Sequence, residues 1–593
     1  MTKSGLSTKF RTHTLGELNK SNLGETVQLT GWVSKRRDHG GLIFVDLRDR
    51  FGLTQIVFNP EKGKELHKEA EKIRSEFVLQ VKGKVVPRPK GTENPKLVTG
   101  EIEVEVQELK ILAAAEVTPF EVSEDSFVSD DIRLKYRFLD IRRKTMQKNL
   151  IFRYNVTRAV RNYLDGECFV EVETPYLTRS TPEGARDYLV PCRLSPGDFY
   201  ALPQSPQLFK QLLMVAGMDR YYQLARCFRD EDLRADRQPE HTQIDVEMSF
   251  VEQDDIMNLI EGMLVSVFKN LMNVDLKRPF LHISYDEAMN KYGSDKPDLR
   301  YALEIKDVTE IFKSTTFKVF QDLIQAKGSI KALVVEGGAQ FSRKDMDDMT
   351  EHVKGFGAKG LVWIKKSASG EWESPVAKHL AGELDTLGKT LGAKNGDAIF
   401  IVAADWRTAC FALGALRTYL ANKLNLIPEG KFELAWIVDF PLFEYSDEEK
   451  RWMALHHPFT APKNEDIAKL KSDPGAVRAK AYDIVLNGTE IGGGSIRIHD
   501  RTVQSQVFES LGIGADEAQD KFGFLLKALS FGAPPHGGIA IGLDRLCAML
   551  LGTESIRDVI AFPKTQKGTC LMTEAPSKVA PKQLKELGIK LSS

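Results

Sequence analysis

Cysteine and long apolar runs are scarce in this chain, and their scarcity argues against several kinds of protein. The 593 residues include six cysteines, and no two of them form a CxxC pair. This argues against a cysteine zinc site and a disulfide framework, so we expect a reducing compartment. No apolar run is long enough to cross a bilayer, and the N-terminus lacks the apolar core of a secretion signal. We therefore expect a cytoplasmic protein with no membrane partner.

An excess of charge of either sign is also missing. The chain has 82 lysines and arginines against 83 aspartates and glutamates, a net charge of −1. Without a global positive field, a nucleic-acid partner would have to be met by local basic patches. The composition is that of an ordinary globular protein, 42% hydrophobic and 28% charged. The length exceeds what one hydrophobic core normally supports, so we expect several domains.

Residues 1 to about 110 have the pattern of a small β-barrel. Five strand segments, with a helical segment at 62–74 before the fourth, fit the OB type; they are 26–35, 42–47, 53–58, 77–86 and 101–112. Basic groups and an aromatic ring on the outer face would suit a single-stranded nucleic-acid loop. The candidates are Arg36, Arg37, Phe44, Arg48 and Gln55. A plain barrel with Phe44 in its core is the alternative that the pattern leaves open.

A strongly charged stretch, 226–247, separates two strand segments near the middle of the chain. Guanidinium groups suit phosphate oxygens, and carboxylates could hold an amine or a metal. The arginines are Arg229, Arg234 and Arg237, and the carboxylates are Glu231 and Asp245. Polar and apolar residues alternate over 243–248, which predicts a half-buried strand. A solvated hairpin with surface ion pairs is the alternative.

A proline-bounded turn opens another predicted helix, which covers 207–217. The free N–H groups at a helix N-terminus can bind an anion. Lys210 lies on the first turn of this helix, from where its side chain can reach back to the same point. Upstream, Pro182–Tyr188 is a polar loop that contains glycine. Together these segments predict an anion-binding site at the start of the helix.

From about 288 to 422, helical and strand segments alternate, which predicts an inserted α/β domain. It contains Gly355–Gly360, which spells the GxGxxG pattern of dinucleotide sites. In such a site the glycines follow a strand and open a helix. Here they follow a helical stretch, 344–354, and precede a strand, 361–365. We therefore interpret the glycines as a helix stop, not as a nucleotide site.

After residue 422, the sequence again contains side chains suited to ligand binding. The pair His456–His457 is weak evidence for a metal, because no further ligands stand at zinc spacing. Asp483 and Glu490 flank a strand and a turn, and their oxygens make them candidate ligands of Mg²⁺.

Glycine-rich strands complete the candidate site. Gly492–Gly494 would let a ligand approach the backbone closely. Ser495 and Arg497 follow at alternate positions, so they share one face of the strand. Further on, the stretch 535–546 predicts a glycine-rich strand that runs into a helix carrying Arg545, an arrangement suited to phosphate.

Three of these stretches resemble, in the right order, the signature motifs of class II aminoacyl-tRNA synthetases. They are the helix over 145–164 with the strand that ends at Pro175, Arg229 with Glu231, and Gly542–Arg545. Longer stretches narrow the resemblance to the bacterial-type aspartyl-tRNA synthetases over nearly the whole chain: Thr181–Asp187, Gln204–Lys210, Phe228–Glu247 and Gly492–His499. The resemblance implies a six-stranded antiparallel catalytic sheet flanked by helices, and a homodimer built partly on the first motif.

The family's arrangement implies a multidomain α/β protein. The expected parts are an OB-type anticodon-binding domain at 1–112, a linker at 113–144, a catalytic domain at 145–287 and 423–562, an inserted α/β domain at 288–422, and a C-terminal extension at 563–593.

For L-aspartate, the resemblance implies a closed pocket with two cations. Such a pocket favours aspartate, because asparagine would leave charge unpaired. Glu183 and Gln207, with Ser205 near them, would hold the ammonium group; Lys210 and Arg497 would bind the side-chain carboxylate, Asp245 would orient Lys210, and His456 would close over the substrate.

For ATP, the resemblance places Arg229 on the α-phosphate, where charge builds as the substrate carboxylate attacks. Arg545 would bind the γ-phosphate. The other implied ATP contacts are Glu231, Gln238, Glu490 and Gly542, and Asp483 with Glu490 would hold Mg²⁺. The reaction would form aspartyl-adenylate and then pass the aspartyl group to the terminal ribose of tRNA, without a covalent enzyme intermediate.

In the barrel, Phe44 and Gln55 match the family's anticodon-reading pair. His39 and Gly91 match members that charge both tRNA(Asp) and tRNA(Asn), whereas strictly tRNA(Asp)-specific members often have leucine in place of His39. A loop that does not penalise the wrong anticodon base relaxes specificity. We predict a non-discriminating ligase, which would need a tRNA-dependent amidotransferase downstream. The alternatives are a discriminating enzyme and ordinary loop roles for His39 and Gly91.

Two other classes of function fit the sequence less well. A catalytically silent paralogue that only binds tRNA or a protein would be indicated by loss of a key cation, and all four are present: Lys210, Arg229, Arg497 and Arg545. A related enzyme that amidates free aspartate needs no anticodon-binding barrel, and a barrel is predicted here. His241 stands where the family usually has phenylalanine, and we attach no function to this difference.

Overall fold

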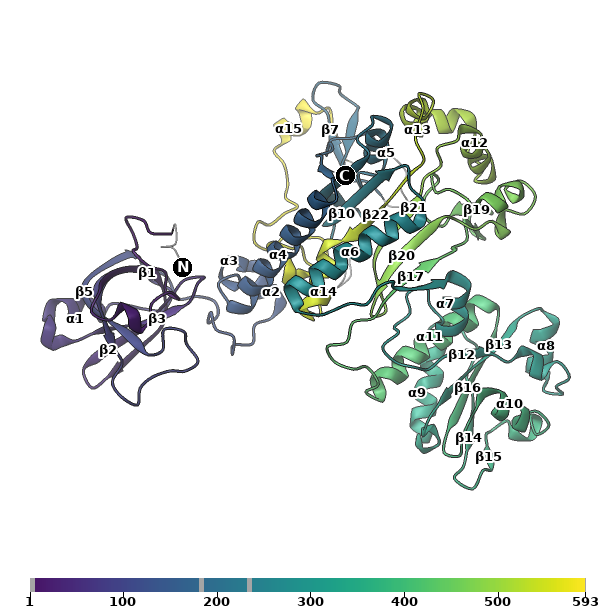
Figure 1. Cartoon of the computed structure of the whole chain (residues 1–593), viewed down its shortest axis with the longest axis horizontal. Helices are drawn as coiled ribbons and strands as arrows, with labels where there is room; N and C mark the ends of the chain where they lie inside the picture. The colour runs from purple at the N-terminus through teal and green to yellow at the C-terminus, as the bar shows by residue number, and fades with distance from the viewer. Residues whose placement is uncertain (1–5, 181–185, 232–236, 592–593) are drawn as a thin grey trace. The chain divides into compact units, whose positions relative to one another are not determined.

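The computed structural model (Figure 1) describes residues 6–180, 186–231 and 237–591. The chain divides into two compact units. The first unit contains Met1–Tyr154 and Thr553–Lys578. The second contains Asn155–Asp232, Asp236–Gly552 and Val579–Ser593. Among the helices of the described residues, none is long and apolar enough to cross a membrane.

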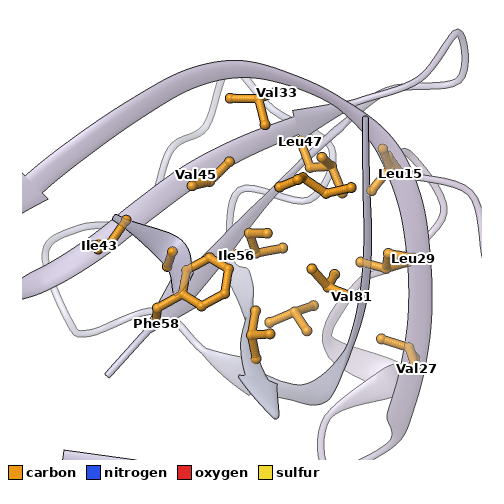
Figure 2. Packing of buried hydrophobic residues seen from close by; sticks show 14 of the residues in the cluster. Leu15, Val27, Leu29, Val33, Ile43, Val45, Leu47, Ile56, Phe58 and Val81 are labelled. Atoms are coloured by element: carbon orange, nitrogen blue, oxygen red, sulfur yellow. The ribbon is translucent and has the colours of Figure 1, made fainter. Parts of the chain in front are cut away.

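A closed five-stranded barrel dominates the first unit, as the strand pattern predicted. The strand order is β1-β2-β3-β5-β4, with β1 at Thr26–His39, β2 at Leu42–Arg48, β3 at Leu53–Phe58, β4 at Val78–Pro87 and β5 at Ile102–Ala113; helix α1 covers Lys64–Ala70. Alternate residues of each strand fill the core, which Figure 2 shows for Ile43, Val45 and Leu47. Phe44 lies on the opposite, outer face and is half-buried, so the alternative that placed it in the core is wrong.

The arginine-rich segment 130–143, which follows the barrel, has a structural role within the first unit. Helices α2 (Asp130–Lys135) and α3 (Arg137–Asp140) lead into α4 (Lys144–Gly166). The buried Arg137 guanidinium donates to the Asp140 carboxylate at 2.6 Å and to the backbone carbonyls of Arg557, Ile560 and Ala561. These bonds satisfy a buried charge and tie α3 to the segment after residue 552.

An eight-stranded sheet organises the second unit, in the order β11-β17-β20-β21-β22-β10-β9-β6. The strands are Leu281–Ser284, Leu434–Val438, Ala481–Leu486, Thr489–Ile496, His536–Gly542, Glu240–Ser249, Arg220–Phe228 and Val170–Glu171, in the same order. The six central strands are antiparallel, as the resemblance implied. The short edge strands β11 and β6 pair parallel with their neighbours, and these two additions extend the sheet to eight strands.

The remaining elements of this unit lie around the sheet. The helices are α5 (Gln207–Val215), α6 (Gln253–Met272), α7 (Tyr285–Tyr292), α12 (Arg501–Ser510), α13 (Ala515–Leu529), α14 (Leu543–Leu551) and α15 (Pro581–Glu586), and two short hairpins join β7 (Leu189–Pro191) to β8 (Phe199–Ala201) and β18 (Phe443–Ser446) to β19 (Arg451–Ala454). Helices α5 and α14 pack on β10.

Strand β10 is buried on both faces, so the prediction of a half-buried strand was wrong. Every residue from Ile244 to Ser249 is buried, including Asp245 and Glu247. The polar face, which alternation assigned to solvent, meets cations from α5 and from the end of β21. Alternation identifies the two faces of a strand but not what covers them.

An antiparallel five-stranded sheet lies in the segment predicted as an inserted α/β domain, in the order β12-β13-β16-β14-β15. The strands are Ile305–Asp307, Ser329–Val335, Ala398–Ala404, Val362–Lys366 and Trp372–Glu373, and the helices are α8 (Lys318–Gln325), α9 (Arg343–Lys354), α10 (Leu384–Leu391) and α11 (Trp406–Lys423). Alternate residues of its strands feed two separate hydrophobic cores. Gly355 caps α9 and the chain then enters β14, as the interpretation of a helix stop required.

Candidate active site

Four buried charged side chains meet at the middle of the central sheet; we call them the sheet cluster: Lys210, Asp245, Glu247 and Arg497. The Lys210 ammonium pairs with Asp245 Oδ1 and lies 3.3 Å from Glu247 Oε2. The Arg497 guanidinium donates to both oxygens of Glu247, at 2.9 and 3.1 Å. Two cations and two carboxylates therefore balance each other out of water, where an unpaired charge would be costly.

The two carboxylates of the sheet cluster respond differently to burial. Burial raises the pKa of Asp245, against the charge and hydrogen bond of Lys210. Burial opposes ionisation of Glu247 too, but the bidentate Arg497 holds the pKa of Glu247 below its usual range. Glu247 is therefore ionised, and its two hydrogen bonds fix the position of the Arg497 guanidinium.

Glycines on the neighbouring strands make room for these side chains. Gly538 on β22 lies opposite Glu247 in the antiparallel register. A Cβ atom at Gly538 would lie 2.0 Å from Glu247 Oε2 and 2.1 Å from the Val246 carbonyl oxygen. Position 538 therefore requires glycine, and the glycine-rich sequence is a condition for burying the cluster.

The sheet cluster and its neighbours include polar atoms without partners. Among the described residues, Asp245 Oδ2, Gln207 Nε2 and His457 Nε2 are buried and have no hydrogen-bond partner. Buried polar atoms in a native fold are normally paired with protein or water, so these atoms are available to a polar ligand. The Ser205 hydroxyl accepts from the Gln207 N–H at 3.2 Å, which places both at the start of α5. Glu183 lies outside the described residues.

The adjacent histidines of the 456–457 pair have opposite electrostatic surroundings. His456 Nε2 lies 3.7 Å from Asp483 Oδ1, and its ring packs edge-on against Phe440. Burial opposes protonation of His456, but Asp483 outweighs it and raises the pKa of the ring. Burial, with the charges of Arg497 and Lys210, lowers the pKa of His457 to about 3. His457 is therefore neutral at pH 7, whereas His456 can carry a positive charge beside the acidic pair of Asp483 and Glu490.

A second group of predicted residues gathers where β21 meets α14. The Arg545 guanidinium donates to the Glu490 carbonyl oxygen at 2.5 Å. Gly542 is the N-cap of α14, and Asp544 accepts from the Thr242 N–H at 2.9 Å, which fixes the helix start against β10. Arg545 is therefore held at a helix N-terminus, a place suited to a phosphate.

Asp483 and Glu490 come from neighbouring strands and converge. A Cβ atom at Gly493 would lie 2.5 Å from Asp483 Oδ1 and 3.9 Å from Glu490 Oε1. Burial and the Asp483 charge raise the pKa of Glu490, and they outweigh the opposing charges of Lys296 and Arg545. No group of three or more possible metal ligands occurs among the described residues. Two carboxylates alone still fit Mg²⁺, which usually takes its other ligands from phosphates and water.

The charged loop between β9 and β10 is partly described. Arg229 donates its backbone N–H to the Pro239 carbonyl, and in the described part of the chain its buried Nε has no partner. Gln238 is buried, whereas Glu231 is half-buried and pairs with Arg237 at 3.0 Å. Arg234 lies outside the described residues. In the described part of this loop, the Glu231–Arg237 pair fits the alternative of a solvated hairpin with surface ion pairs, whereas the buried Arg229 Nε and Gln238 do not.

His241, the departure from the family pattern, lies on β10 opposite Cys227. Burial, followed by the Arg229 charge, lowers the pKa of His241 to about 4. The ring is therefore neutral at pH 7, as the phenylalanine usual in the family would be.

The outer face of the barrel carries a smaller polar network, the barrel cluster: Arg37, Asp46, Gln55 and Glu103. Arg37 donates to Asp46 at 2.7 Å and to the Gln55 amide oxygen at 3.2 Å. The Gln55 amide nitrogen donates to Glu103 at 2.7 Å. The amide is thereby held in one orientation on the face that also carries Phe44.

His39 and Gly91 lie on exposed parts of the barrel unit. His39 ends β1, and Gly91 lies between β4 and β5 with a φ of 89°, in the left-handed region that favours glycine. A Cβ atom at Gly91 would meet nothing within 4 Å, so backbone conformation, not crowding, favours glycine there.

Glu247 is the residue that sequence reasoning missed. It belonged to a strand expected to be half-buried, and no role was assigned to it. The available signal was its spacing of two from Asp245, which puts both carboxylates on one face. Its partner Arg497 stands 250 positions away, so the pairing could not be recognised locally.

Comparison with known proteins agrees with this geometry. The family model of class II tRNA synthetases (D, K and N) matches residues 129–566, and that of the OB-fold nucleic acid binding domain matches 27–112. Proteins named aspartate–tRNA(Asp/Asn) ligase from Desulfatibacillum aliphaticivorans and Caldanaerobacter subterraneus are each 56% identical, over 99% and 98% of this chain and 98% of their own length.

A solved structure supports the fold. Asparaginyl-tRNA synthetase from Pyrococcus horikoshii, complexed with asparaginyl-adenylate, has a TM-score of 0.59 at 19% identity, covering 96% of this chain and 99% of that one. At this identity the likeness concerns architecture alone. The family models and the two relatives confirm the resemblance read from the motifs: the chain belongs to the class II tRNA synthetases of the D, K and N group, in the aspartate–tRNA ligase family.

Proposed function

We propose that this chain uses ATP to attach aspartate to tRNA through aspartyl-adenylate, and that it charges both tRNA(Asp) and tRNA(Asn). The observation that carries this proposal is the sheet cluster. Its cations, Lys210 and Arg497, are fixed by buried carboxylates beside unpartnered polar atoms, with Arg545 and the acidic pair in the same unit.

Selection of aspartate follows from fixed charge. The side-chain carboxylate of aspartate would accept from Lys210 and Arg497, which are already oriented and need no rearrangement. Asparagine presents an amide whose NH₂ would face these donors, and it would leave their charge without a new partner. Ser205, Gln207 and Glu183 would hold the ammonium group, and His456 would cover the substrate.

In the first chemical step, an oxygen of the substrate α-carboxylate attacks the α-phosphorus of ATP. The new O–P bond gives aspartyl-adenylate, and the bond to the β-phosphate breaks, so its electron pair leaves with pyrophosphate. Arg229 would bind the α-phosphate and Arg545 the γ-phosphate, and Glu231, Gln238, Glu490 and Gly542 would contact the nucleotide. Asp483 and Glu490 would hold Mg²⁺, which neutralises phosphate charge when bound.

In the second step, a hydroxyl of the terminal ribose of tRNA attacks the activated carbonyl. The aspartyl ester forms, AMP leaves, and the ribose proton passes to a phosphate oxygen or to water. No protein side chain forms a covalent bond, so catalysis consists of positioning and electrostatic stabilisation.

For tRNA, Phe44 would stack on an anticodon base and Gln55 would read its edge from the orientation that the barrel cluster fixes. Relaxed specificity is supported by His39 and Gly91 and by the names of the relatives. The alternative is a discriminating enzyme that charges tRNA(Asp) alone.

Aspartate-dependent exchange of pyrophosphate into ATP tests the first step. We expect exchange with L-aspartate and at least 100-fold less with L-asparagine, on the order of the discrimination that paired polar groups supply. Absence of exchange with aspartate would remove the proposal.

Charging of purified tRNA(Asn) with aspartate tests the specificity. We expect both tRNAs to be charged, and His39→Leu to lower the charging of tRNA(Asn) relative to tRNA(Asp). Charging of tRNA(Asp) alone by the unchanged protein would favour the discriminating alternative.

The proposal includes a homodimer, a cytoplasmic setting and an amidotransferase that corrects mischarged tRNA(Asn). Support for the dimer comes from helix α4, where Ile151 and Tyr154 are exposed apolar side chains. Support for a reducing compartment comes from six cysteines that are all free. The molar mass in solution, twice that of the chain if correct, tests the dimer.

A further inference from the structure

A loop at the start of the inserted domain, 294–300, reaches the acidic pair of the candidate site. It lies between α7 and β12 and belongs to none of the motifs above. The Lys296 ammonium is 4.0 Å from Glu490 Oε2. Both side chains are partly exposed, 49% for Lys296 and 39% for Glu490, so the ammonium lies at an open edge of the site.

The loop is held firmly by charged groups. The Asp298 carboxylate accepts from the Arg300 guanidinium at 2.7 and 3.0 Å, and the Asp298 carbonyl accepts from Arg417 at 2.7 Å. Arg417 is a buried residue of α11 whose guanidinium lies 5.0 Å from the Tyr292 ring and 4.2 Å from the Tyr301 ring. The core of the inserted domain therefore fixes the position of the loop.

The same loop packs on the turn that precedes Glu490. Gly488, in the turn between β20 and β21, has a φ of 81°. A Cβ atom at Gly488 would lie 3.0 Å from the Asp298 Cβ. A side chain at position 488 would push the loop away, so close contact here sets the distance between Lys296 and Glu490.

The charges at this corner leave a place for a polyanion. Glu490 interacts with the positive charges of Arg545, on α14, and of Lys296, on the loop, and with the negative charges of Asp483 and Asp295. In the described part of the chain, Lys296 has no ionic partner closer than the 4.0 Å approach to Glu490. A lysine with rotatable donors and no tight pair can turn to a phosphate oxygen.

We propose that Lys296 binds the pyrophosphate end of ATP, together with Arg545, and that the inserted domain positions it through Arg417. This inference rests on the proposed function. Negative charge grows on the departing pyrophosphate as its bond to the α-phosphorus breaks, and an ammonium fixed at that end stabilises it. The inserted domain thereby takes part in amino acid activation, although it carries none of the family's motifs.

Steady-state ATP–pyrophosphate exchange by the full chain tests the role of Lys296. We expect Lys296→Met to raise KM for ATP or lower kcat so that kcat/KM for ATP falls at least tenfold, with KM for aspartate within twofold of the unchanged protein. Lys296→Arg should recover part of the loss, because charge is kept. A kcat/KM for ATP within twofold in Lys296→Met would overturn the inference.

Lys291→Met is the matched control. Lys291 lies one turn away on α7, where it pairs with Glu287 at 2.7 Å, and we expect unchanged exchange. An equal loss in this variant would overturn a specific role for Lys296.

Arg417→Lys tests the positioning part, because it keeps the charge but loses the planar fork. We expect a smaller rise in KM for ATP with KM for aspartate unchanged, whereas an equal rise in both would overturn the positioning role. Failure of the unchanged protein to exchange with aspartate concerns the proposed function instead. The two failures are therefore distinguishable.

Discussion

The sheet cluster and the barrel cluster each contain an arginine, an aspartate and a glutamate, but these groups lie in different surroundings. In the sheet, Arg497 holds both oxygens of Glu247 and the side chains are buried. On the barrel, Arg37 makes one bond to Asp46, and 43% of the Arg37 side chain is exposed. In both networks an arginine orients a carboxylate on a strand.

The pKa directions show what this difference does. In the barrel, burial raises the pKa of Asp46 and of Glu103, and it outweighs Arg37 and Gln55. In the sheet, burial likewise raises the pKa of Asp245, but at Glu247 the charges of Arg497 and Lys210 outweigh burial and lower the pKa. A buried bidentate ion pair therefore holds its carboxylate in the ionised form, whereas the barrel cluster mainly orients an amide. The predictions below test this contrast.

Removal of Arg497 should have the largest effect. Arg497→Met leaves Glu247 buried without its partner, so we expect destabilisation of about 3–5 kcal/mol and loss of aspartate-dependent exchange by about 10³-fold. Exchange kinetics and thermal unfolding measure both.

The surface variant Arg451→Met, which removes a pair with Glu449, serves as the control and should behave like the unchanged protein. If Arg497→Met kept exchange within tenfold, the sheet cluster would not be the amino acid site.

Gly538→Ala should have the second largest effect, although it removes no charge. The added methyl group would overlap Glu247 and the Val246 carbonyl, and overpacking of this kind costs about 1–3 kcal/mol. We expect a lower melting temperature and at least tenfold weaker exchange. Gly360→Ala, where nothing lies within 4 Å, is the control. Equal melting temperatures of the two variants would contradict the close fit.

Phe44→Ala should weaken tRNA binding at the barrel without affecting amino acid activation at the sheet cluster. Loss of one stacked base costs about 1–3 kcal/mol, so we expect KM for tRNA to rise roughly tenfold or more by the same principle. Exchange without tRNA should stay unchanged, because the sheet cluster is intact. Charging assays over a range of tRNA concentrations measure the rise, with Phe10→Ala as a control on an exposed ring. Weaker exchange in Phe44→Ala would contradict the prediction that the two clusters act independently.

The smallest effect concerns acid stability. The pKa of His457 is about 3 in the fold and about 6.5 in an unfolded chain, so its stabilisation of the folded state is present above pH 6.5 and is lost as pH falls towards 3. His457→Asn keeps an acceptor for the Phe459 N–H and removes this titration. We expect its melting temperature to fall less between pH 6.5 and pH 4.

The exposed His282→Asn serves as the comparison and should leave the pH dependence unchanged. An identical slope for His457→Asn and the unchanged protein would show that His457 does not set acid stability.

Local patterns predicted much of the fold. Five short strand segments with a helical segment before the fourth were enough to predict the barrel, and strands such as β2 place alternate residues in its core. The order of helix, glycines and strand was enough to reject a nucleotide site at Gly355–Gly360. The half-burial of β10 was predicted wrongly, because the residues that cover its polar face come from α5 and β21.

By itself, the sequence determined the periodicities, the glycine positions and the motifs from which the family could be read, because these depend on neighbours in the chain. Only the tertiary structure decided that Glu247 meets Arg497 and that Lys296 approaches Glu490. Such pairings depend on which distant segments the fold brings together. Burial then decides their strength, because charges attract more strongly where water is excluded.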